Sequence, residues 1–162
     1  MPSNLFPQLN LPPAELTIRH PADGAGRPTV MCLSRRRFVA LTPEEWVRQH
    51  FLAHMISNLG YPPGLVQAEA PVRIGSSRQR ADIVAFSRQM EPLVIVECKA
   101  PQVQLSQLTL NQACRYLSVL SARAVVLTNG LSHYCVTISP GNSAPHFAHS
   151  LPTWQDIYTN TL

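Results

Sequence analysis

The stretch Leu93-Val94-Ile95-Val96-Glu97-Cys98-Lys99-Ala100-Pro101 determines how the rest of the chain is interpreted. Four aliphatic residues, three of them β-branched, lead into Glu-Cys-Lys and a proline, which is typical of a buried strand that ends on charge. Side chains alternate along a strand, so we expect Glu97 and Lys99 on one face and Cys98 on the other. An unpartnered buried charge costs on the order of several kcal/mol. The two charges therefore form either a structural ion pair or a catalytic site, and these residues alone leave both alternatives open.

The apolar segment at residues 80–86 places a second acid near the first. It contains Asp82, and the connection over residues 87–92 is short and polar, as in a β-hairpin. In an antiparallel hairpin the start of the first strand lies beside the end of the second, so we expect Asp82 close to Glu97 and Lys99. Two adjacent carboxylates repel unless a cation lies between them, and a hard divalent ion such as Mg²⁺, or Mn²⁺, meets that need. Without metal, we expect this repulsion to be relieved when Asp82 is neutralised.

Five blocks of sequence, in order, carry a family resemblance. They are Thr42–Phe51, Arg80–Val84, Glu97–Pro101, Gln112–Tyr116 and Thr128–Gly130. The Asp…Glu-X-Lys pattern resembles the PD-(D/E)XK nuclease superfamily, although Ala81 stands where the superfamily name has Pro. The five blocks together resemble the N-terminal nuclease domain of type I restriction enzyme R subunits, over roughly residues 36–140. The ATP-driven translocase of those subunits has no counterpart in these blocks, so a motor function is not implied.

The resemblance implies a metal site with defined ligands. Asp82 and Glu97 would hold the metal, with the backbone carbonyl of Cys98 as a further ligand. Lys99 would position the attacking water or stabilise charge on the phosphate. The cofactor implied is Mg²⁺ or Mn²⁺, and the chemistry is hydrolysis of DNA phosphodiester bonds.

A helix is expected to begin at Thr42-Pro43-Glu44-Glu45, because Thr42 can cap, Pro43 suits the first turn and Glu45 completes a capping box. The family places a glutamate of this helix toward the metal site. Glu45 matches that position better than Glu44, because Arg48 follows it by three residues as in the family pattern. Glu45 is thus a candidate for both capping and catalysis.

Gln112 and Tyr116 are four residues apart on a second expected helix, so they share a face. The pair resembles a motif that some nucleases of the superfamily use near the metal and DNA, although such residues on a helix are usually surface residues. We expect Gln112 to contribute to catalysis. The expected DNA contacts are Tyr116, Arg48, Arg78 and Arg80, the last two being equally consistent with solvated turn residues.

Composition is consistent with one domain that has an ordinary core. The chain has 162 residues, 45% of them hydrophobic, and a net charge of +4, which favours a polyanionic partner. The four cysteines form no Cys-X-X-Cys pair, which argues against a zinc site and a disulfide framework and for a cytoplasmic protein. The sequence has neither a membrane-spanning apolar stretch nor a secretory signal pattern.

We therefore predict an α/β fold, with a restriction-endonuclease-like mixed sheet of four to five strands flanked by helices at 43–59 and 105–121. An irregular arm at 1–35, packed on the domain or forming a homodimer contact, precedes a nuclease-like domain at 36–162. The predicted function is a metal-dependent deoxyribonuclease that acts on DNA, with other restriction or defence subunits as further partners and no membrane. The alternatives are a non-catalytic DNA-binding or assembly module and a metal-free domain in which Asp82, Glu97 and Lys99 form an ion-pair network.

Overall fold

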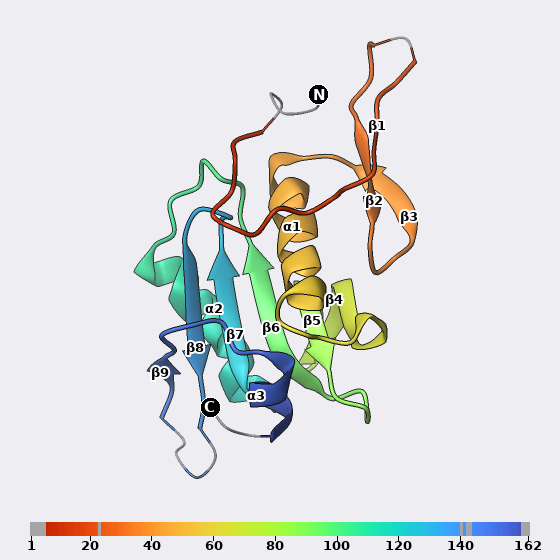
Figure 1. Cartoon of the computed structure of the whole chain (residues 1–162). Coiled ribbons are helices and arrows are strands. Elements are labelled where there is room, and N and C mark those ends of the chain that lie inside the picture. Colours follow the sequence, from red (N-terminus) through yellow and green to blue (C-terminus); the bar gives the residue numbers. More distant parts are fainter. Residues whose placement is uncertain (1–5, 23, 140, 142–143, 160–162) are drawn as a thin grey trace.

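The computed structural model describes residues 6–22, 24–139, 141 and 144–159, and consists of two sheets with flanking helices (Figure 1). The small sheet contains β1 (Ile18–Arg19), β2 (Thr29–Cys32) and β3 (Arg37–Ala40). The large sheet contains β4 (Val66–Ile74), β5 (Ser77–Phe86), β6 (Pro92–Cys98), β7 (Ala124–Thr128), β8 (His133–Thr137) and β9 (His146–Phe147). The helices are α1 (Pro43–Ser57), the 3-10 turn η1 (Pro63–Leu65), α2 (Gln107–Val119) and α3 (Trp154–Thr159).

The large sheet is mixed and runs in chain order from β4 to β9. Only β6 and β7 are parallel, because α2 carries the chain between them in a crossover. Helix α1 covers one face of the sheet and α2 the other (Figure 1), and each helix packs on its own apolar cluster. The predicted α/β class is confirmed, and the large sheet has six strands where four to five were predicted, because the two-residue β9 pairs with β8.

Helix α1 begins as its capping residues predict, but it is buried on more sides than an amphipathic helix. The Thr42 Oγ1 accepts a hydrogen bond from the backbone N of Glu45 at 3.0 Å. Polar residues Arg48 and Gln49 are buried as well as the apolar ones, because Arg48 packs against the β4–β5 hairpin and Gln49 against the β2–β3 turn. The backbone N of Leu33 donates to Gln49 Oε1 at 3.1 Å across that contact.

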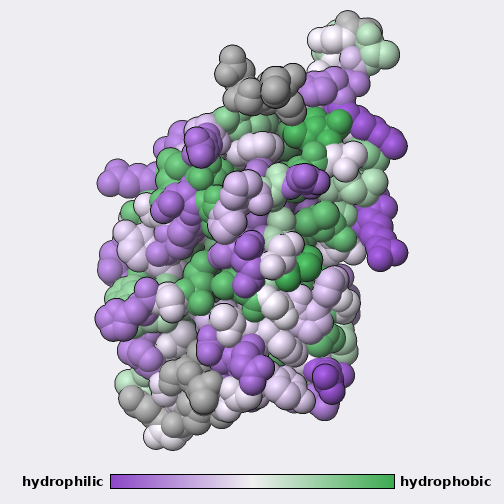
Figure 2. All heavy atoms as spheres, in the orientation of Figure 1, coloured by the Kyte–Doolittle hydropathy of each residue, from purple (hydrophilic) through white to green (hydrophobic). Residues whose placement is uncertain are grey.

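The arm over residues 1–35 is not irregular throughout. It contributes β1 and β2 to the small sheet, and the expected boundary after residue 35 falls in the turn between β2 and β3. Its described start crosses over α1 (Figure 1) and packs on the domain, where Leu9 is buried and the backbone N of Asn10 donates to Gly130 O at 2.8 Å. On this side of the molecule, hydrophilic residues gather along the outer edge beside β3 (Figure 2).

The β4–β5 hairpin changes faces midway along its length. Val66 and Ala68 belong to the core on the α1 side, whereas Ala70 and Val72, further along the same strand, belong to the core on the α2 side. The change occurs at Glu69, which has a φ of +50°. Across the hairpin, this position lies opposite Asp82, between the pairs Ala68–Ile83 and Ala70–Ala81.

Within the described residues, the helices are too short or too polar to cross a membrane.

Candidate functional site

Asp82 and Glu97 lie opposite one another where the β5–β6 ladder ends. The last residue pair of this end of the ladder is Ile83–Val96, and the next positions are Asp82 and Glu97. Asp82 Oδ2 accepts a hydrogen bond from the backbone N of Cys98 at 2.7 Å, which fixes the carboxylate at the end of β6. The hairpin thus brings the two acids together as its length predicts.

Glu97 and Lys99 line a cavity of about 140 Å³ on the α2 side, whereas Cys98 is buried in the core on the α1 side. This is the alternation that a strand imposes. The walls of the cavity come from β5, β6, β7 and α2. They are formed by Arg80, Glu97, Lys99, Thr109, Gln112, Ala113, Arg115, Tyr116 and Leu127.

The cavity collects five of the residues predicted for the site: Arg80, Glu97, Lys99, Gln112 and Tyr116. It also includes Thr109 and Arg115, which the sequence analysis missed. Helical spacing was the available signal, because these two residues lie three positions before and after Gln112. Arg78 is exposed on the hairpin and is not part of the cavity wall.

The environment of Glu97 raises its pKa to about 7. Burial is the largest cause, the negative charge of Asp82 is the second, and the Tyr116 hydroxyl opposes both by favouring the charged form. Glu97 Oε1 is buried and has no hydrogen-bond partner among the described residues. A buried carboxylate oxygen without a partner, beside a second carboxylate, is a group that a bound cation would satisfy.

The donor set therefore fits a hard divalent cation. The described residues contain no group of three or more His, Cys, Asp and Glu side chains placed to hold a metal. A cation here would have Asp82 and Glu97, a backbone carbonyl such as that of Cys98, and solvent oxygens as ligands. Mg²⁺ commonly binds in this manner, through one or two carboxylates and several waters.

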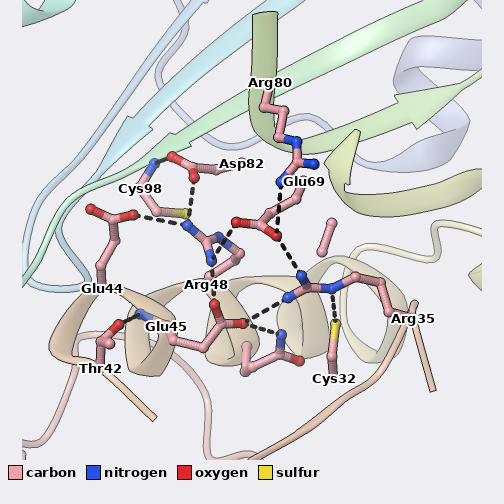
Figure 3. A network of polar contacts seen from close by, with 12 residues as sticks. Cys32, Arg35, Thr42, Glu44, Glu45, Arg48, Glu69, Arg80, Asp82 and Cys98 are labelled. Atoms are coloured by element: carbon pink, nitrogen blue, oxygen red, sulfur yellow. Dashed lines mark hydrogen bonds and ion pairs between the residues drawn. The ribbon is translucent and has the colours of Figure 1, made fainter. Parts of the chain in front are cut away.

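Arg48, predicted as a DNA contact, is buried in the centre of a charge network (Figure 3), and a contact with DNA stays a prediction. Its side chain is 6% exposed, and its Nη2 contacts Asp82 Oδ1 at 2.6 Å and Glu44 Oε1 at 2.8 Å. Its Nη1 pairs with Glu45. Since carboxylates occupy the guanidinium, Arg48 orients Asp82 and does not face solvent.

Glu45, predicted to be catalytic, is not among the residues that line the cavity, and its catalytic role stays a prediction. Its carboxylate accepts from Gln49 Nε2 at 2.7 Å and pairs with Arg48 and Arg35 (Figure 3). The neighbouring Glu44 interacts electrostatically with residues of the site. Burial and the charge of Asp82 raise its pKa, whereas Arg48 and Lys99 lower it. Neither glutamate lines the cavity, and Arg48 links both of them to Asp82.

Glu69 is a further member of the network that the sequence analysis did not identify. Its carboxylate contacts Arg35 at 2.5 Å and, more loosely, Arg48 at 3.8 Å and Arg80 at 3.9 Å. No local pattern marked it, because its position depends on the positive φ that turns the strand. Together, Glu69 and Asp82 join the hairpin to α1 through Arg48.

Lys99 is the only lysine of the sequence, among many arginines. Its backbone N donates to Thr128 O at 2.8 Å, which holds it beside β7. In the described part of the chain, no carboxylate lies within ion-pair distance of its ammonium group. The ammonium is therefore available at the cavity, which weakens the alternative of a structural Glu97–Lys99 ion pair.

Comparisons with known proteins concern the same region. The sequence profile of the family described as "Type I restriction enzyme R protein N terminus" matches residues 43–152. The structure resembles a fragment described as an HsdR subunit of a type I restriction enzyme from Vibrio vulnificus, with a TM-score of 0.53 and 18% identity over 75% of this chain and 25% of that chain. It also resembles the type IIG restriction endonuclease BpuSI, with a TM-score of 0.44 and 22% identity over 70% of this chain and 15% of that chain.

No curated protein matches the chain in sequence. The chain spans about a quarter of the length of the Vibrio vulnificus fragment, and at this identity the likeness concerns the fold alone.

Proposed function

We propose that this chain, which belongs to the family of type I restriction enzyme R protein N-terminal regions, is a deoxyribonuclease that uses a divalent cation. The family expected from the five sequence blocks is confirmed. The proposal also includes membership of the PD-(D/E)XK superfamily, hydrolysis of DNA and association with other subunits of a restriction system.

One observation carries the proposal. The unpartnered Oε1 of Glu97 is buried next to Asp82, in a cavity that also contains the ammonium of Lys99. Arg48 partly neutralises Asp82, but Oε1 of Glu97 has no partner among the described residues, so the protein does not fully balance the repulsion between the two acids. The same two acids beside an available lysine are suited to hold Mg²⁺ or Mn²⁺ and to act on a phosphate ester.

In the mechanism that follows, Asp82, Glu97 and the carbonyl of Cys98 would hold the cation. A cation so bound polarises the phosphoryl group and lowers the pKa of water. Arg48 and the backbone N of Cys98 keep Asp82 oriented through its two oxygens. Lys99 orients the attacking water or stabilises the charge that develops on the phosphate. Tyr116 favours the ionised form of Glu97, which is the form that binds a cation.

A non-catalytic role as a DNA-binding or assembly module is the second candidate. It is favoured by the ion pair between Arg48 and Asp82, which partly neutralises Asp82 without any metal. This ion pair is the kind of network that a metal-free domain would contain, although it joins Asp82 to Arg48 rather than to Lys99.

Lys99→Met provides the test, because it removes the free ammonium while leaving the Arg48 network untouched. Wild type is expected to cleave DNA with Mg²⁺ or Mn²⁺ and not with EDTA, and Lys99→Met is expected to lose about 100-fold or more in rate. Arg88→Met is the matched control, because it removes an exposed positive charge at the β5–β6 turn. Linear and circular substrates in the same assay distinguish exonuclease from endonuclease action. If Lys99→Met cleaves DNA at the wild-type rate, the catalytic role of Lys99 is wrong. If wild type shows no metal-dependent cleavage, the non-catalytic DNA-binding or assembly module is the better description.

A further inference from the structure

We propose that Arg73 and Arg78, near the tip of the β4–β5 hairpin, together bind one backbone phosphate of the DNA, away from the cleavage site. The proposal rests on the proposed function in taking DNA as the ligand. It adds a separate anchoring site and a residue, Arg73, that the sequence analysis did not connect with DNA.

The two arginines face each other directly across the hairpin. Arg73 pairs with Arg78 in the β4–β5 ladder, two positions from the tight turn at Gly75 and Ser76. Directly opposed residues of antiparallel strands share a face, with Cβ atoms about 4.5–5.5 Å apart. Two like charges so placed destabilise the hairpin. An anion between the guanidinium groups removes that repulsion, and a phosphate diester can accept hydrogen bonds from both.

Neither arginine is neutralised by the protein. Both side chains are exposed. Among the described residues, the ion pairs within 4.0 Å involve Arg35, Arg48 and Arg80 but neither Arg73 nor Arg78. Among the described residues, other exposed arginines such as Arg88 also lack a carboxylate partner, so what distinguishes Arg73 and Arg78 is that they are paired directly across the hairpin.

The face that carries the pair leads to the candidate site. Arg78 and Arg80 are two residues apart on β5, before the position at which the hairpin changes faces, and so share one face. Arg80 lies 3.9 Å from Glu69 and also lines the cavity beside Glu97, so it connects the pair to the site. Arg78 and Asp82 are four residue steps apart along the strand, about 13 Å at ~3.3 Å per residue. This is the axial length of about four base steps of B-DNA at ~3.4 Å each. One DNA strand can therefore contact the arginine pair and the cleavage site together.

The opposite face of the hairpin fixes the pair in place. Ala70, Val72 and Ala81 are buried in the core on the α2 side, and Ile74 packs against that core. The arginines are thus held on a short, anchored ribbon, and less conformational freedom is lost when a phosphate binds.

A salt series of DNA-binding measurements tests the proposal. A duplex of about 20 base pairs is titrated in EDTA, where no cleavage interferes, with wild type, Arg73→Thr, Arg78→Thr and the double variant. Each single variant is expected to bind more weakly and to reduce the slope of log affinity against log salt by about 1. The double variant should reduce the slope by about the same amount, because the two side chains bind one phosphate.

Arg88→Thr is the matched control, since it removes the same charge from an exposed position at the other end of β5. Thermal melts at low salt give an independent readout. Arg73→Thr should melt above wild type, and inorganic phosphate should raise the melting temperature of wild type but not of the variant.

An Arg73→Thr slope equal to that of Arg88→Thr would overturn the proposal, and would mean that the arginine serves only to keep other strands off the edge of β4. This outcome is distinguishable from failure of the proposed function. Loss of metal-dependent cleavage in Lys99→Met tests the catalytic site and not the arginine pair. At saturating DNA, Arg73→Thr should cleave at the wild-type rate.

Discussion

At the scale of the residue, Glu97 couples the stability of the metal-free protein to pH. Its pKa is about 7 in the folded protein, raised above its ordinary value of 4.5 by burial and by Asp82. Folding therefore favours the protonated form. The stability that this group contributes is fully present below about pH 4.5 and is lost as pH rises to about 7.

We expect Glu97→Gln to be more stable than wild type at pH 8 in EDTA, by about 1–3 kcal/mol. The difference between the two proteins should shrink as pH falls toward 4.5, because wild type then becomes protonated. Denaturant unfolding at several pH values measures this. Glu91→Gln, at an exposed turn position, is the control and should follow wild type. A constant difference across the pH range would show that Glu97 titrates normally.

Substitution of Asp82 distinguishes a metal-binding site from a metal-free ion-pair network. Its ion pair with the buried Arg48 reverses the expectation that neutralisation relieves repulsion, because Asp82→Asn leaves Arg48 with a weaker partner. We expect Asp82→Asn to lose about 1–3 kcal/mol of stability without metal. Wild type should gain about 2.7 kcal/mol at a Mg²⁺ concentration of ~100 times its Kd, and the variant should gain nothing. Thermal melts with and without Mg²⁺ report both effects, and an equal gain in the variant would place the cation elsewhere.

At the scale of the element, the turn between β7 and β8 is shaped by its contact with the N-terminal arm. Gly130 has a φ of +83°, and a Cβ there would lie 2.7 Å from Leu9 Cδ2 and 3.1 Å from Val47 Cγ2. Both the backbone conformation and the space therefore require glycine.

Gly130→Ala is expected to destabilise the protein by about 1–3 kcal/mol, through strain at a positive φ and the approach to Leu9. Gly64→Ala, at a glycine with no atom within 4 Å of the added Cβ, should leave stability nearly unchanged. Denaturant midpoints compare the two variants. Equal midpoints would mean that the arm moves aside at little cost.

At the scale of the whole molecule, the N-terminal arm joins elements that are distant in sequence. Leu9 is buried in the core with Val47, Asn10 bonds Gly130 and His133 Nε2 contacts Asn10 O at 2.9 Å. The Trp46 indole donates to Pro7 O at 3.3 Å. The arm is therefore a structural part of the domain, although the family profile begins only at residue 43.

Removal of residues 1–11 should lower the melting temperature by several degrees, because burial of Leu9 alone contributes about 1.5–3 kcal/mol. Leu9→Ala in the full chain should account for a large share of that loss, which scanning calorimetry can measure. Glu15→Gln, at an exposed position of the same arm, is the control. An unchanged melting temperature after truncation would mean that the arm contributes no net stability.

Local sequence signals are sufficient to predict the elements around the site and most of the residues that lie together there. The aliphatic runs, the short hairpin and the helix-start residues are local signals, and they place Asp82 opposite Glu97 and Lys99 on the face of Glu97 because strand alternation is local as well. The Gln112–Tyr116 spacing predicted a shared helix face for the same reason, and both residues line the cavity beside Glu97.

The partners of the charged side chains depend on tertiary packing. Arg48 pairs with Asp82, Glu44 and Glu45, and Glu69, which has a positive φ, joins the same network. These choices depend on how α1 is rotated over the sheet and where the hairpin changes faces. Packing between segments far apart in the chain sets both, and no local pattern of residues encodes it.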